Sequence, residues 1–93
     1  MRVGGVVAVL VAGLMAAAPA HADGTPFLDY LAGNGFGYLD AQRVLSDGNV
    51  ACVNDRHEVP VELNILMLTS RAYTDAEAQA VVAAERQAAP QLC

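Results

Sequence analysis

Hydrophobic and polar positions divide the chain into an uncharged N-terminal stretch and a remainder in which apolar residues recur at helical spacing. The uncharged stretch, residues 3–20, follows the basic residue Arg2, and its apolar centre is residues 6–15. That centre has about the ten residues of a secretory signal core and falls short of the roughly 20 that span a bilayer. The pattern predicts a signal peptide and argues against a retained membrane anchor.

A cleavage site follows this stretch. Ala20 and Ala22 flank His21 in the small-x-small pattern that signal peptidase accepts before the cut. We therefore expect residues 1–22 to be removed between Ala22 and Asp23. No cysteine stands at the cleavage point, so lipid attachment is not expected there. The mature domain, residues 23–93, has a length at which a hydrophobic core alone gives marginal stability.

A short first helix is predicted at the start of the mature domain. Thr25 and Pro26 provide an N-cap and a first helical residue, and apolar residues follow at helical spacing. The Gly-Asn-Gly sequence of residues 33–35 tolerates left-handed backbone and predicts the end of this helix. We expect Phe36 and Tyr38 to fold back onto the core from the connection.

A second helix is expected after Asp40, which is its predicted cap. Val44, Gly48 and Cys52 share one of its faces at i, i+4 and i+8. Glycine inside a helix costs roughly 1 kcal/mol relative to alanine. We therefore expect another helix to approach closely at Gly48.

Residues 61–69 fit two patterns. Val61, Leu63 and Ile65 alternate with other residues as they would in a strand. A helix is preferred because no other segment resembles a partner strand and because Pro60 suits the first helical position. A strand is the alternative.

The last predicted helix has the clearest signals. Thr74 and Glu77 have the spacing of a capping box, and an alanine-rich run continues to about Ala89, before Pro90. Glu85 falls in the middle of the apolar stripe, where we expect its stem to lie on apolar surface and its carboxylate to reach water. The stripe consists of Ala78, Val81, Val82, Ala88 and Leu92.

Cys52 and Cys93 are the two cysteines of the chain. An even count in an exported chain of this size predicts a disulfide rather than catalytic or metal-binding thiols, and two cysteines allow one pairing. The bridge would tie the last helix to the second. The expected fold is therefore all-α, a small bundle of three or four short helices with one disulfide, after a cleaved signal peptide.

The charge of the mature domain is strongly negative. The chain has ten acidic and five basic residues, and Arg2 is lost with the signal peptide, so four basic residues remain and the net charge is about −6. Such a surface repels phosphate backbones and anionic lipid. We therefore expect neither nucleic-acid binding nor electrostatic membrane docking.

Candidate chemistry is sparse. Asp55, His57 and Glu58 are too close in sequence to converge easily on one ion, and the mature domain has no second histidine, so we interpret them as a solvated loop between helices. Glu85 lacks an identifiable partner for a catalytic acid, and the hydroxyl residues lack a recognisable base. The sequence indicates no catalytic residue, metal site or cofactor.

A family resemblance extends over nearly all of the mature domain. It is carried by Phe27, Leu28, Leu31, Gly35, Tyr38, Gly48, Ala51, Cys52, Thr74, Gln79, Ala80, Leu92 and Cys93. In these positions, above all in the paired cysteines, the chain resembles the actinobacterial, largely mycobacterial, exported family catalogued as domain of unknown function number 732. The resemblance implies a small exported, helical, disulfide-bonded domain, and it supplies no catalytic residue.

Three functional hypotheses follow. The first is a non-enzymatic exported protein that binds an unidentified protein partner in the cell envelope or outside the cell. The alternative is a carrier or sensor of a small apolar ligand held between helices, because residues 61–69 hold more apolar side chains than one helix face needs. These are Leu63, Ile65, Leu66, Met67 and Leu68. An envelope hydrolase that uses Glu85 and His57 ranks third.

Overall fold

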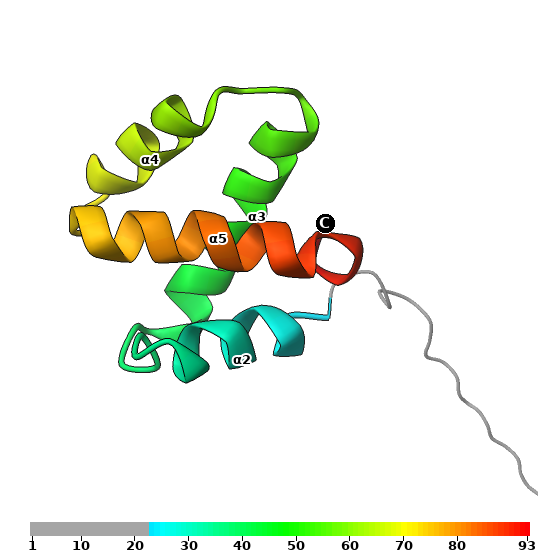
Figure 1. Ribbon diagram of the computed structural model, residues 1–93, viewed down its shortest axis with the longest axis vertical. Coiled ribbons are helices and arrows are strands. Elements are labelled where there is room, and N and C mark those ends of the chain that lie inside the picture. Colours follow the sequence, from blue (N-terminus) through cyan, green and yellow to red (C-terminus); the bar gives the residue numbers. More distant parts are fainter. Residues whose placement is uncertain (1–22) are drawn as a thin grey trace, which may run out of the picture.

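Four α-helices and no strands make up the part of the chain that the structure, a computed structural model, describes, residues 23–93 (Figure 1). They are α2 (Thr25–Gly33), α3 (Ala41–Arg56), α4 (Val61–Thr69) and α5 (Asp75–Leu92). The prediction of an all-α bundle is confirmed, and the strand alternative for residues 61–69 is excluded. The predicted signal peptide, Ala22 included, lies outside the described residues.

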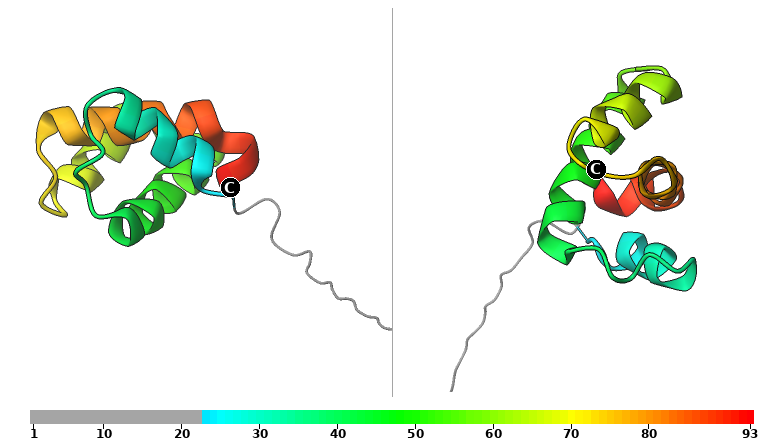
Figure 2. Two further views of the ribbon diagram at one scale, coloured as in Figure 1. Left: turned by 90° about the horizontal axis from the view of Figure 1, so that it is seen from below. Right: turned by 90° about the vertical axis from the view of Figure 1, so that its left-hand side faces the viewer.

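Helix α5 is the common packing partner of the other three helices. In Figure 1 it crosses in front of α3, with α4 on one side of it and α2 on the other. The view along α5 in Figure 2 shows the same arrangement, with α3 running past α5 from the level of α2 to that of α4. The core lies between these helices, and the whole predicted stripe of α5 is buried in it.

The helix starts follow the predicted capping signals in two cases. The Asp40 side chain accepts a hydrogen bond from the Arg43 amide at 2.9 Å. Thr74 and Glu77 form the complete capping box, each side chain accepting from the other residue's amide. These bonds satisfy amides that the first turn of a helix leaves without partners.

The other two starts differ from the prediction by one residue. Helix α2 begins at Thr25 itself, with Gly24 as N-cap, because the Asp23 carboxylate accepts from the Thr25 amide at 3.0 Å. Helix α4 begins at Val61, so Pro60 is its N-cap rather than its first helical residue.

The predicted end of α5 near Ala89 is wrong, because the helix continues through Pro90 to Leu92. Proline lacks the amide hydrogen that an interior helical position uses. Tertiary contacts hold the last turn in spite of this. Leu92 is buried, its carbonyl accepts a hydrogen bond from Asn49 of α3 at 3.1 Å, and the Cys93 amide donates to the Ala89 carbonyl at 3.1 Å.

The predicted disulfide joins α3 to the residue that follows α5. Cys52 and Cys93 are 41 positions apart in sequence, and their Cα atoms lie 6.1 Å apart, within the usual range for a disulfide. Cys52 is fully buried. The cross-link therefore holds the C-terminal end of α5 against the core face of α3.

In the α2–α3 connection, the prediction that Phe36 and Tyr38 fold back onto the core is correct for only one of them. Gly35 has a φ of 90°, as its turn position requires, and Phe36 packs against the core. Tyr38, however, is 68% exposed. Its hydroxyl donates to the Glu77 carboxylate at 2.7 Å, so it contacts the start of α5 at the surface instead.

Gly48 is a point of close contact between helices, as the sequence predicts, but the group that approaches it is a side chain of α2. A Cβ atom at this position would lie 2.5 Å from Cζ of Phe27 on α2, and Phe27 is fully buried. The absence of a side chain at Gly48 thus makes room for the ring of Phe27 in the core.

We predict that Gly48→Ala lowers the free energy of unfolding by about 1–2 kcal/mol, because overpacking against a buried ring exceeds the gain in helix propensity. The control is Gly33→Ala at the exposed end of α2, where a Cβ meets nothing within 4 Å. It is expected to leave stability unchanged or slightly raised. Denaturant unfolding measures both, and equal effects of the two variants would contradict the close-approach explanation.

Candidate functional site

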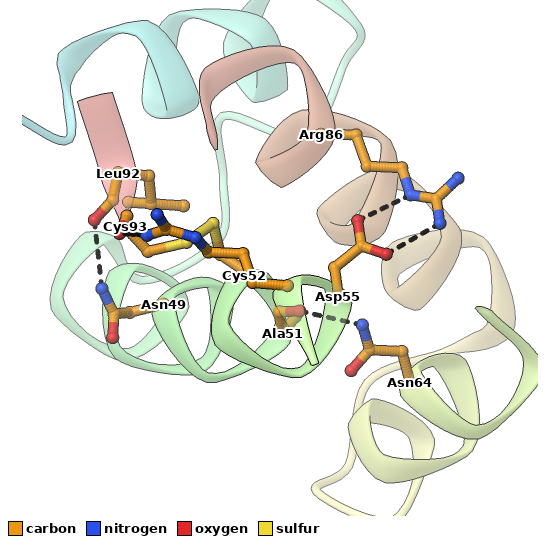
Figure 3. The surroundings of a disulfide bond; sticks show 9 residues. Asn49, Ala51, Cys52, Asp55, Asn64, Arg86, Leu92 and Cys93 are labelled. Atoms are coloured by element: carbon orange, nitrogen blue, oxygen red, sulfur yellow. Dashed lines mark hydrogen bonds and ion pairs between the residues drawn. A yellow bond between two sulfur atoms is a disulfide. The ribbon is translucent and has the colours of Figure 1, made fainter. Parts of the chain in front are cut away.

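Charged groups cluster where α3 and α5 meet, close to the disulfide (Figure 3). Asp55, in the last turn of α3, accepts two hydrogen bonds from the guanidinium of Arg86 on α5, both at 2.9 Å. Arg56 donates to the Cys93 carbonyl. A single exposed salt bridge contributes little to the free energy of folding. This bidentate pair nevertheless fixes the position of α5 relative to α3 at the point where it joins them.

Glu85 lies inside this junction, and the expectation that its carboxylate reaches water is wrong. The residue is 0% exposed, and neither carboxyl oxygen has a hydrogen-bond partner in the described residues. Burial, and secondly the nearby Asp55 carboxylate, raise the pKa of Glu85 to about 8. The position of Glu85 in the middle of the apolar stripe was a sequence signal for burial, but the pattern could not show that three helices pack around α5 and leave the carboxylate no path to water.

The interpretation of Asp55, His57 and Glu58 as a solvated loop is correct for two of these residues. His57 is the exposed C-cap of α3, and Glu58 is an exposed residue of the connection with a φ of 63°. It is wrong for Asp55, which lies in the last turn of α3 and accepts hydrogen bonds from Arg86. No group of three histidine, cysteine or acidic residues in residues 23–93 is arranged to hold a metal ion.

A second polar cluster, which sequence reasoning missed, joins α3 to the α4–α5 connection. Asp47 is almost fully buried, accepts a hydrogen bond from the Tyr73 hydroxyl at 2.8 Å and pairs with Arg71 at 3.0 Å. Arg43 covers the Tyr73 ring, with its guanidinium carbon 4.2 Å from the ring centroid. Burial, followed by the hydrogen bond to Asp47, raises the pKa of Tyr73 to about 12. The only sequence feature that could have indicated this cluster is the position of Asp47 on the same helix face as Val44.

Asn64 shows how α4 is attached to α3. This buried side chain donates to the Ala51 carbonyl at 2.9 Å (Figure 3). It also accepts from the side-chain amide of Asn54 at 3.1 Å. The inward face of α4 is therefore fixed by polar bonds as well as by the buried Leu68. This attachment determines which side of the helix faces solvent.

The outward face of α4 exposes two large apolar side chains. Leu63 is 53% exposed and Leu66 is 61% exposed, one turn apart on the helix. Glu62 is exposed beside them, and it lies on the same face as Leu66 at i, i+4. We call Glu62, Leu63 and Leu66 the α4 face, and it is the candidate functional site.

Two open hollows lie elsewhere, and Phe36 lines both of them. The first, of about 250 Å³, lies between α2, the α2–α3 connection and the start of α3, and includes Leu28 and Val44. The second, of about 380 Å³, lies between α2 and α5, and includes Tyr30 and Ala80. Neither hollow is lined by Glu85 or by a residue of α4.

Comparisons of the chain with protein families, curated proteins and solved structures found no match. Within the described residues, no helix combines the length and apolar character that crossing a membrane requires. The candidate site therefore rests on the geometry of the chain itself.

We predict that Tyr73→Phe lowers the free energy of unfolding by about 1–3 kcal/mol, because buried Asp47 loses a hydrogen bond that water cannot replace. Tyr38→Phe is the matched control, since it removes a hydroxyl bond to a carboxylate at the exposed surface. It is expected to cost less than about 0.5 kcal/mol. Urea unfolding at pH 7 compares the variants, and a Tyr38→Phe loss as large as that of Tyr73→Phe would refute the assignment.

Proposed function

We propose that this chain is an exported, non-enzymatic interaction protein that binds a protein partner through the α4 face. The observation that carries the proposal is the exposure of Leu63 and Leu66 next to each other on a helix whose inner face is anchored. Single exposed apolar residues are ordinary, whereas contiguous apolar patches mark contact surfaces. Leu63 and Leu66 are the most exposed large apolar side chains on the described helices. Burial of both leucines against a partner would favour binding through the hydrophobic effect.

The charge around the α4 face points to the chemistry of the partner. Glu62 and Glu58 form no ion pair within the described residues, and the mature domain is acidic as a whole. The complementary surface is an apolar patch flanked by arginine or lysine. Opposite charges at the rim of such a contact speed association and make it sensitive to salt.

Export is part of the same proposal. The signal-like residues 1–22 support it, and a disulfide between buried and half-buried cysteines is typical of proteins that fold outside the cytoplasm. The envelope and the extracellular medium are therefore the places in which to look for the partner.

The apolar residues of α4 that suggested an apolar-ligand carrier have other surroundings in the structure. Leu68 is buried, Ile65 and Met67 pack against the core, and Leu63 and Leu66 face solvent. None of them lines either of the two hollows. The α4 residues thus serve the core and an outer surface rather than a cavity.

We predict that the double substitution Leu63→Ser with Leu66→Ser abolishes partner binding while it changes the free energy of unfolding by less than about 1 kcal/mol. The matched control is Val50→Ser with Val53→Ser, which removes two apolar side chains, each 40% exposed and one turn apart on α3. Cross-linked complexes from envelope and culture fractions are captured with each form of the protein, and the captured partner is then tested for direct binding at low and high salt.

The expected result is binding by the wild type and the α3 variant, loss with the α4 variant, and weakening by salt. Equal binding by the α4 variant, or no partner in repeated captures, would contradict the proposal. A lipid that copurifies with the protein in native mass spectra would instead favour the carrier alternative.

A further inference from the structure

Glu85 differs from the other buried polar side chains of the described residues. Asp47 and Asn64 have hydrogen-bond partners, whereas the buried side-chain atoms that lack one in residues 23–93 are the two carboxyl oxygens of Glu85. A buried group without partners costs free energy, and an ionised one costs much more. The chain therefore holds Glu85 in a place that disfavours its charge.

The surroundings of Glu85 offer it no cation. On α5 its helical neighbours Val81, Ala84 and Ala88 are buried and apolar. Arg86 is adjacent in sequence and acts on Glu85 through its charge, but its guanidinium is engaged in two hydrogen bonds with Asp55.

The charged group that faces Glu85 from a neighbouring helix has the wrong sign for an ion pair. Asp55 of α3 is a carboxylate, and it opposes ionisation of Glu85 by its negative charge and by its capacity to accept a hydrogen bond. Asp55 and Arg86 are the titratable groups that act on Glu85, and neither α2 nor α4 contributes one from the described residues. Ionisation would thus place two carboxylates together at the α3–α5 contact.

We propose that Glu85 is a proton-dependent switch of the α3–α5 contact: α5 stays packed on α3 while the carboxyl carries its proton, and α5 loosens from α3 when the proton leaves. The disulfide at the end of α5 keeps the two helices tethered in the loosened state. This inference is independent of the α4 face, since it concerns a different pair of helices.

The sign of the pH dependence follows from the two states. The pKa of glutamate is near 4.5 in the unfolded chain and about 8 at Glu85 in the folded one. Between these values the folded chain holds one proton more, so the unfolding constant rises about tenfold per pH unit as the pH increases. The contribution of protonated Glu85 to the free energy of unfolding is therefore fully present below pH 4.5. It is lost progressively as the pH rises to about 8.

The disulfide itself provides the readout of loosening. Cys52 is fully buried and Cys93 is half-buried, so attack of a reductant on either sulfur is expected to become faster when the helices separate. The experiment measures the rate at which a fixed concentration of a phosphine reductant cleaves Cys52–Cys93 in the full chain, expressed for export so that the disulfide forms. The pH is varied from 6 to 9, and each rate is divided by that of Glu85→Gln at the same pH, which cancels the pH dependence of the reductant.

The expected ratio of wild-type to Glu85→Gln rates rises at least about tenfold between pH 6 and pH 9, with a midpoint near pH 8, in step with the ionised fraction of Glu85. Asp55→Asn removes the like charge and frees Arg86, so its midpoint moves to lower pH. Asp29→Asn, which changes an exposed carboxylate of α2, keeps the wild-type profile. A ratio that does not change with pH would overturn the proposal.

A second measurement needs no variant. The carboxyl carbon signals of ¹³C-labelled glutamates in the wild-type chain are followed from pH 3 to pH 10. One glutamate with a midpoint near pH 8 is expected. Titration of all four glutamates below about pH 6 would equally overturn the proposal, because Glu85 would then be ionised in the packed state.

Discussion

The disulfide between Cys52 and Cys93 fixes the end of α5 against the C-terminal half of α3, and the rest of the packing depends on this junction. Helix α5 is the element against which α2, α3 and α4 all pack, so its position determines where each of them can bury its apolar residues. A domain of about 70 residues has little core with which to hold such an arrangement. A cross-link that closes a loop of 41 positions restricts the unfolded chain and so adds stability to this small core.

Two of the buried polar side chains hold helices together through hydrogen bonds, whereas the third makes a helix contact depend on its protonation. Asn64 attaches α4 to α3, and Asp47 attaches the α4–α5 connection to α3, in both cases through satisfied hydrogen bonds. These bonds give α4 a defined inner face and thereby an outer face on which Leu63 and Leu66 stand exposed. Glu85 has no such partner, so the contact of α3 with α5 depends on its protonation. A rigid scaffold for a contact surface and a titratable helix contact thus coexist in one small domain.

The sequence predicted those features that depend on local signals. The Asp40 cap, the capping box of Thr74 and Glu77, the close approach at Gly48 and the single cysteine pairing are each determined by a few residues, and each was found in the structure. Features that depend on which other helices pack over a residue could not be predicted from the sequence. Pro90 signals a helix end, but Asn49 and Cys52 of α3 hold the turn beyond it. Glu85 falls in the middle of the apolar stripe, but only the three helices packed around α5 show that its carboxylate is covered as well as its stem. Leu63 and Leu66 likewise resemble core residues until the inner face of α4 is known.

The dependence of the whole domain on the α3–α5 junction is tested most directly by its free energy of unfolding with and without the disulfide. The full oxidised chain is compared in urea, at one pH below 6, with the double variant Cys52→Ala and Cys93→Ala, so that Glu85 is protonated in both. The cross-link of this loop length is expected to contribute about 2–4 kcal/mol, so the variant should lose that amount and unfold at lower urea concentration. A loss of less than about 0.5 kcal/mol would contradict the account, because the core alone would then hold α5 in place.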